Sequence, residues 1–148
     1  MHRARLFACC AFALLAPLAL PGSASAQAGG AASLDVTVRY TGPGTVDAEN
    51  RIWVWIFASP DFATNPAAAA PVGEGSISTN GGVATFANLP AEVWVGVIFD
   101  ERGGFQGQAP PPSGSPAFAY SVDGQLASVR PAPQGRVEVV FDETVRVP

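Results

Sequence analysis

The stretch FANLPAEVWVGVIFDERGG, residues 86–104, decides the expected fold. Its centre reads as a strand with two apolar faces. One face carries Val93, Val95, Val97 and Phe99, and the other carries Trp94, Gly96 and Ile98. Strands of this kind are covered on both sides. We therefore expect residues 92–99 to form a central strand, which begins after a tight Leu89-Pro90 turn and ends in an acidic, glycine-rich loop.

Three further segments read as long strands. Residues 34–40 (LDVTVRY) and 136–142 (RVEVVFD) alternate apolar and polar side chains, which is typical of strands with one face in the core and one in water. Residues 51–58 (RIWVWIFA) are apolar on both faces, like the central strand. We expect all three to pack beside residues 92–99.

Turn signals predict two hairpins and one helical turn. An Asn-Gly pair stands at 80–81 and an Asp-Gly pair at 123–124, and both favour two-residue hairpin turns. The flanking runs are 75–79 with 83–87 for the first hairpin and 117–122 with 126–130 for the second. A Ser-Pro pair at 59–60 has the pattern of a helix N-terminus.

Many short strands, recurrent turn signals and no long amphipathic helix are typical of an all-β sandwich. We expect residues 34–148 to form one antiparallel β-sandwich of about seven strands with an immunoglobulin-like Greek-key order. Residues 27–33 are small and polar and read as a flexible leader before the domain.

The N-terminal residues have the pattern of a secretory signal peptide. Arg3 and Arg5 precede an apolar run at 6–20, and small residues at Ala24 and Ala26 form an A-x-A cleavage signal. We expect residues 1–26 to be removed and the product to be exported, to the periplasm or outside the cell. The alternatives are an uncleaved anchor helix, although the run is shorter than the ~20 residues that a span needs, and lipid attachment at Cys9.

The charge balance argues against some partners. The chain has 12 acidic residues, 8 arginines and no lysine, with a formal net charge of −4. Loss of Arg3 and Arg5 with the signal peptide takes this charge from −4 to −6. Nucleic acids and anionic membrane surfaces attract basic patches. We expect neither partner, and no membrane insertion after cleavage.

Signal cleavage would also narrow the available chemistry. Cys9, Cys10 and His2 are the only residues of their kinds, and all three precede the cleavage site. Serine–histidine and cysteine–histidine nucleophile systems are then excluded, as are zinc and copper sites with nitrogen or sulfur ligands. We predict no catalytic residues and no enzyme activity. The catalytic alternative is a carboxylate-based glycosidase, which would use Asp100 and Glu101 with Asp123 or Glu74.

Two features are candidate binding sites. Trp53, Trp55 and Phe57 form an aromatic stripe, which Trp94 would join across the sheet. The stripe would offer its tryptophans as a platform for sugar rings or a protein if exposed, or would form a second core layer if covered. The acidic loop that begins at Asp100 and Glu101, joined by Asp123, would supply oxygen ligands for calcium. Otherwise these carboxylates are the polar residues of a strand-ending turn, and no cofactor is expected.

The segment LPAEVWVGVIFDERGG resembles a family of secreted bacterial β-sandwich domains of unknown function, which are similar to the transthyretin-like (prealbumin-like) regulatory domains of carboxypeptidases. Leu89 and Pro90 match the family's turn, Trp94 takes the place of its aromatic residue, and Asp100-Glu101 match the start of its loop. The resemblance covers residues 34–147 and implies a transthyretin-like fold.

The chain departs from the family pattern in two places. The glycine that follows the turn is absent, and the further loop acids and asparagines are replaced. The residues that stand there instead are Ala91, Glu92 and Val93 after the turn and Arg102, Gly103 and Phe105 in the loop. Transthyretin-like hydrolases of purine breakdown need histidines, so the resemblance does not carry that activity over.

These observations lead to two hypotheses of function. The first is an exported, non-enzymatic β-sandwich that acts by binding a protein or a surface. The alternative is a carbohydrate-binding module that uses the tryptophan stripe. The partner is correspondingly an unknown protein or a polysaccharide.

The cleavage site is testable by intact-mass and N-terminal analysis of the exported protein. We expect an N-terminus at Gln27, because Ala24 and Ala26 form the first A-x-A signal that follows the apolar run. A retained Met1, or a lipid mass on Cys9, would contradict this expectation.

Overall fold

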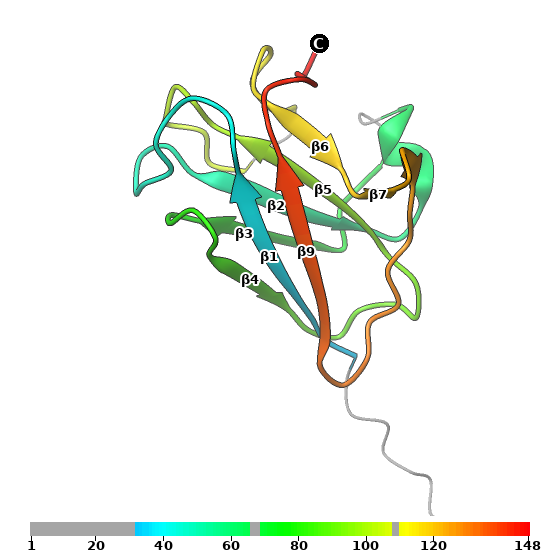
Figure 1. Ribbon diagram of the computed structural model, residues 1–148. Coiled ribbons are helices and arrows are strands. Elements are labelled where there is room, and N and C mark those ends of the chain that lie inside the picture. The colour runs from blue at the N-terminus through cyan, green and yellow to red at the C-terminus, as the bar shows by residue number, and fades with distance from the viewer. Residues whose placement is uncertain (1–31, 66–68, 108–109) are drawn as a thin grey trace, which may run out of the picture.

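A computed structural model describes residues 32–65, 69–107 and 110–148. The predicted signal peptide and most of the leader lie outside the described residues. These described residues form nine strands and one 3₁₀ turn, and Figure 1 shows their arrangement. In order they are β1 (Leu34–Tyr40), β2 (Ile52–Phe57), the 3₁₀ turn (Pro60–Ala63), β3 (Gly73–Ile77), β4 (Val83–Phe86), β5 (Trp94–Phe99), β6 (Ala117–Ala119), β7 (Ser121–Val122), β8 (Gln125–Leu126) and β9 (Gly135–Phe141).

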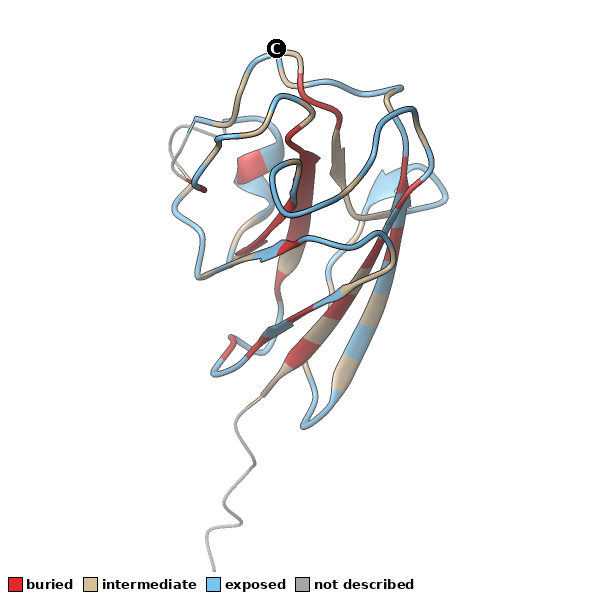
Figure 2. Ribbon diagram, turned by 90° about the vertical axis from the view of Figure 1, so that its left-hand side faces the viewer, coloured by how far each residue is buried: buried red, intermediate tan, exposed pale blue. Residues whose placement is uncertain are grey.

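The strands form two main sheets that share one core, which confirms the all-β prediction. One sheet has the order β4-β1-β9, the other has the order β3-β2-β5-β6, and β7 and β8 form a separate small ribbon. Buried residues alternate along β1 and β4, whereas β2 and β5 are buried along almost their whole length. Figure 2 shows the buried residues in red. The arrangement is β-sandwich-like.

The inner face of each sheet is the one that the apolar alternation predicts. Val93, Val95, Val97 and Phe99 of the central segment are all at most 2% exposed. They pack with inward side chains of β1, β2 and β9 in one continuous cluster. The members contributed by these three strands are Leu34, Val36, Val38, Tyr40, Ile52, Val54, Ile56, Val139 and Phe141.

The pairing of the first and last strands corrects the expectation of a purely antiparallel sandwich. β1 pairs with β4 in the antiparallel sense, but with β9 in the parallel sense, from Leu34↔Gly135 to Tyr40↔Phe141. Local hairpin signals cannot reveal this pairing, because its partners lie 101 residues apart in the sequence. The predicted inward faces of β1 and β9 are nevertheless correct, because both strands place their alternate apolar side chains in the same core.

The hairpin predicted at Asn80-Gly81 is wrong. β3 pairs with β2, whereas β4 pairs with β1, so the connection crosses between the two sheets. The Asn80 side chain explains why the chain turns there. Its Oδ1 accepts from the N–H of Tyr40 at 2.8 Å, and its Nδ2 donates to the carbonyl of Tyr40 at 2.7 Å. Asn80 therefore extends the edge of β1 with a side-chain amide instead of closing a hairpin.

The second predicted hairpin is confirmed, in a shorter form. β7 and β8 pair as Ser121↔Leu126 and Val122↔Gln125. Asp123 and Gly124 have φ angles of 52° and 75°, the positive values that a type I′ turn requires at both central positions. The backbone closes again below the hairpin, where the N–H of Ala127 donates to the carbonyl of Tyr120 at 3.0 Å.

The expected helical turn after β2 is also confirmed. Ser59 is its N-cap, and the Ser59 hydroxyl accepts from the N–H of Asp61 at 3.2 Å. Pro60 stands at the start, where its missing N–H costs nothing. Across the described residues, no helix has the length and apolar character to cross a membrane.

Replacing Asn80 tests its role in the crossing between sheets. We expect Asn80→Ala to lower the free energy of unfolding by about 1–3 kcal/mol, because two hydrogen bonds to the Tyr40 backbone are lost. Chemical denaturation measures the effect. Thr79→Ala, an exposed neighbour, is the matched control and should change little. Equal stability of the two variants would contradict the interpretation.

Candidate functional site

The outer face of the four-stranded sheet, which carries the tryptophan stripe, is covered. Trp53 and Trp55 are each only 8% exposed. The ring of Phe105 meets both indoles edge-on, with centroid distances of 5.4 Å to Trp53 and 6.0 Å to Trp55. Val147, near the C-terminus, packs on the same cluster. Trp53 and Trp55 thus belong to a second, smaller core and do not form an open platform.

A second aromatic side chain covers the other half of this face. Phe62, from the 3₁₀ turn, stacks on Phe57 with a centroid distance of 4.2 Å and an interplanar angle of 4°. Both rings lie against Gly96, where an added Cβ would stand 3.2 Å from each. Trp94 is partly buried and lies opposite Phe57 in the β2–β5 register, so it stands at the end of the stripe.

The acidic loop after β5 is organised by Asp100. This residue is 1% exposed, and its Oδ2 accepts from the N–H of Phe105 at 2.9 Å. Asn50 fixes the loop from below by donating to the carbonyls of Asp100 and Glu101 at 3.3 and 2.7 Å. The Asp100 carboxylate therefore bends the loop back over the sheet and places the Phe105 ring on the indoles.

Glu101 is held by the C-terminal segment. Arg146 donates to Oε2 of Glu101 at 2.9 Å and to the carbonyl of Gly114 at 2.6 Å. The hydrogen bond with Glu101 raises the pKa of Arg146, which stabilises its charged form. Nearby, burial raises the pKa of Tyr40, and the charges of Glu101 and Glu143 raise it further.

The three predicted calcium ligands are not brought together. Asp100 is bonded to the loop backbone, Glu101 to Arg146, and Asp123 forms the tip of the β7–β8 hairpin. Among the described residues, no group of three or more histidine, cysteine, aspartate or glutamate side chains could hold a metal ion. The arrangement gives Asp100 and Glu101 structural partners, so neither the calcium site nor the carboxylate pair of a glycosidase gains support from it.

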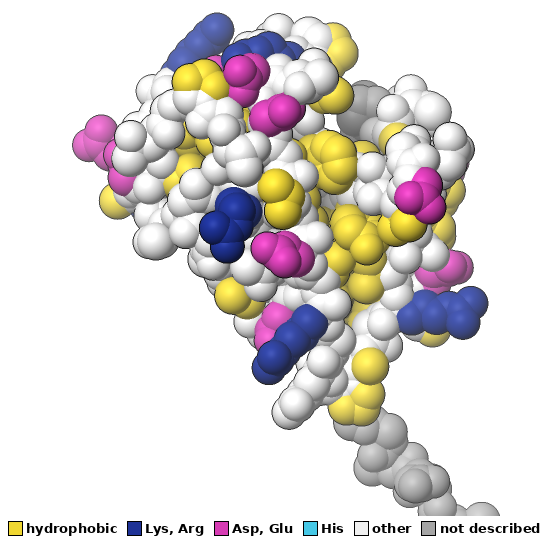
Figure 3. Space-filling model, in the orientation of Figure 1, with side chains coloured by type: hydrophobic (Ala, Val, Ile, Leu, Met, Phe, Trp, Pro, Cys, Tyr) yellow, Lys and Arg dark blue, Asp and Glu magenta, His cyan; other side chains and the backbone are white. Residues whose placement is uncertain are grey.

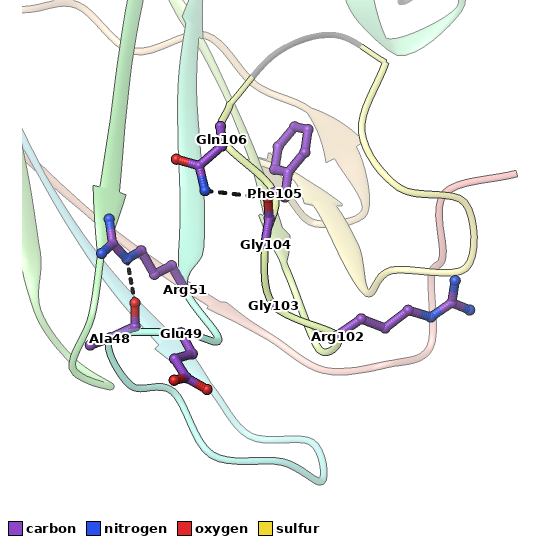
Figure 4. A pocket seen from close by; sticks show the side chains of 8 residues that line it. All are labelled: Ala48, Glu49, Arg51, Arg102, Gly103, Gly104, Phe105 and Gln106. Carbon is purple, nitrogen blue, oxygen red and sulfur yellow. Dashed lines mark hydrogen bonds between the residues drawn. The ribbon is translucent and has the colours of Figure 1, made fainter.

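A surface pocket lies between the loop that precedes β2 and the loop that follows β5 (Figure 4). Its charged side chains do not converge. Arg51 and Arg102 point in different directions, and Nε of Arg51 is bonded to the carbonyl of Ala48 at 2.7 Å. Gln106 donates to the carbonyl of Gly104 at 3.3 Å, within its own loop. These groups stabilise the loops and do not face a common ligand.

Sequence reasoning missed the free edge of β9. The N–H of Gly135 donates to Ser33 and the carbonyl of Phe141 accepts from Thr41, so these two residues face β1. Because successive residues of a strand direct their backbone groups to opposite sides, those of Arg136, Glu138 and Val140 face away from β1. In the described part of the chain these groups have no hydrogen-bond partner. In the sequence, the only sign of this free edge is the length of the run 136–142.

Beside this edge runs an apolar seam, which we define as Phe118, Tyr120, Val129 and Val137. These four side chains pack against the main core but are only partly buried. Val137 belongs to β9 and Phe118 to β6, the outermost strands of the two sheets. Figure 3 shows hydrophobic surface in the hollow between β9 and the side of the molecule that carries β6 and β7. The sandwich is therefore incompletely closed on this side.

Comparison with known protein families finds no family model that matches the chain, and comparison with curated proteins finds no match.

The cover over the tryptophan stripe can be tested by fluorescence. In a Trp94→Phe background the emission comes from Trp53 and Trp55, and we expect acrylamide to quench it slowly. Phe105→Ala should increase the quenching and lower the stability by about 1–3 kcal/mol, because a partly buried ring is lost from the cluster. Val145→Ala, at an exposed position near the C-terminus, is the control.

The same measurement addresses the sugar platform. Fast quenching in the Trp94→Phe background, combined with protection by an oligosaccharide, would contradict a covered stripe and support the carbohydrate-binding hypothesis. Slow quenching that oligosaccharides leave unchanged agrees with a second core.

Proposed function

We propose that this protein is an exported, non-enzymatic β-sandwich domain that binds a polypeptide partner along the free edge of β9. The observation that carries the proposal is the edge of β9, a seven-residue strand beside the apolar seam, which no other described strand pairs. The transthyretin-like or immunoglobulin-like Greek key is part of the proposal and rests on the sequence resemblance. Export to the periplasm or the exterior rests on the predicted signal peptide.

The edge and the seam suit an extended segment of a partner. Arg136, Glu138 and Val140 offer N–H and C=O groups in the spacing of a β-ladder, so an added strand would gain main-chain hydrogen bonds. Every second side chain of such a strand would point toward the core side, where Val137 and Phe118 are partly exposed. Main-chain bonding then supplies affinity and the seam supplies selectivity.

A role without catalysis is supported by how the chain uses its buried polar groups. Asp100 is the carboxylate with the least exposure, and it accepts a backbone hydrogen bond that shapes the loop. Glu101 is engaged by Arg146. These carboxylates serve the fold, and a general acid and base for glycoside hydrolysis would need to face each other across a cleft.

The carbohydrate-binding alternative has less support than the polypeptide partner. It needs Trp53 and Trp55 to be open to solvent, but Phe105 and Val147 cover them. Trp94 alone is a partly exposed indole at the end of the stripe. One ring offers much less stacking surface than the three that the hypothesis assumed.

Site-specific photo-crosslinking can test the binding edge. Val140 on β9 and Val83 on β4 are matched positions, with 50% and 54% exposure on the two outer strands of one sheet. We expect a crosslinker at residue 140 of the exported protein, in its native cell, to capture a polypeptide that mass spectrometry can identify. Residue 83 serves as the control. Equal or absent capture at both positions would overturn the proposed function.

A further inference from the structure

We infer that the strand added to β9 comes from a second copy of this chain, so that two molecules pair their β9 strands in the antiparallel sense across a twofold axis. This inference rests on the proposed function, because it names the partner of the same edge. It is argued from the charge pattern of the three residues whose backbone groups face that edge, Arg136, Glu138 and Val140.

Only a few registers let these residues form a ladder with their own copy. In an antiparallel pair, a residue whose backbone N–H and C=O face the free edge must lie opposite a residue of the other strand whose backbone groups also face that edge. A twofold axis at Arg136 places two arginines opposite each other, and an axis at Glu138 places two glutamates opposite each other. Like charges in directly opposed positions destabilise a sheet. Both of these registers are therefore disfavoured.

An axis at Val137 gives the complementary register. Arg136 of each copy then lies opposite Glu138 of the other, which makes two equivalent cross-strand ion pairs. Val140 lies opposite Gln134, an uncharged residue. An axis at Val139 would instead place Arg136 opposite Asp142, whose carboxylate already accepts from the N–H of Thr144. It would also leave Glu138 opposite Val140, without a charge partner. The order Arg-Val-Glu at 136–138 is thus self-complementary in one register.

The side chains of Arg136 and Glu138 are available to a second copy, because their ion pairs within the chain are weak. Arg136 approaches Asp35 at 3.9 Å, and Glu138 approaches Arg39 at 3.9 Å, which is the long limit for an ion pair. The Arg136 side chain is 79% exposed and the Glu138 side chain is 59% exposed. Exposed pairs of this kind contribute little to stability. Both charges can therefore turn toward a second copy at little cost to the stability of the fold.

The apolar seam gains from the same register. Val137 points to the core side of the sheet and is only partly buried. With the axis at Val137, the two copies of this side chain face each other in the close, non-hydrogen-bonded position of the ladder. The strand that each copy receives also extends its three-stranded sheet beside the partly exposed seam. Charge pairing on the outer side and apolar contact on the inner side thus favour one geometry.

Charge reversal on β9 tests the second copy as partner. We expect the parent protein to show a concentration-dependent monomer–dimer equilibrium in sedimentation velocity. Arg136→Glu alone and Glu138→Arg alone should each weaken the dimer about tenfold or more, because two attractive pairs become repulsive. The double variant R136E/E138R should recover an affinity within about threefold of the parent, since the opposed charges are exchanged. Arg130→Glu makes the same charge change off the strand and should have no effect.

A proline at position 138 gives an independent measurement. Glu138→Pro removes an N–H that faces the free edge and no hydrogen bond to β1, and proline is tolerated on edge strands. We expect the variant to be monomeric with a cooperative melt, which separates loss of pairing from loss of folding.

The outcomes distinguish the two proposals. A parent protein that stays monomeric at all concentrations, or a dimer that the charge reversals leave unchanged, overturns the second copy as partner. If crosslinking at Val140 then captures a different polypeptide, the proposed function stands with another partner. Capture at Val140 of this chain's own segment around Gln134, at the start of β9, together with rescue in the double variant, supports the inference.

Discussion

Strands β2 and β5 are apolar on both faces, and the need to cover both faces shapes the rest of the structure. The inner face packs on β1 and β9 in the main core. The outer face has no third sheet to cover it among the described residues, so two loops do this work. One places Phe62 on Phe57, and the other places Phe105 on the two indoles. The buried Asp100 and the chain around Arg146 hold the second loop in that position.

The sequence predicts the strands well and their partners poorly. Alternation identified the inward faces of β1, β5 and β9, because side-chain burial is a local property of each strand. It could not show that β9 lies parallel to β1, or that Asn80 carries the chain from one sheet to the other. Both depend on contacts between segments far apart in the chain, and an Asn-Gly pair reads the same in a hairpin and in a crossing.

The candidate site was predictable to the same extent: its separate segments can be identified from the sequence, but their contacts cannot. The sequence presents the tryptophan stripe and the acidic loop as separate features and does not decide whether the stripe is buried. In the structure they are one unit, because the Asp100 carboxylate positions the Phe105 ring that covers Trp53 and Trp55. The edge of β9 escaped notice because an unpaired strand edge leaves no mark in composition or spacing. Only the sheet order reveals it.

The β7–β8 hairpin lies between two segments that both hydrogen-bond to the same side of the β5 segment. Tyr120 donates to Val95, and Val129 pairs with Val93, while the bond between Ala127 and Tyr120 closes the base of the hairpin. The sheet is therefore continuous without residues 121–126. Changes in the length of this hairpin do not shift the register of β5, and exposed turn tips accept insertions readily. The Asp123-Gly124 tip is a natural place to graft a peptide loop onto this scaffold.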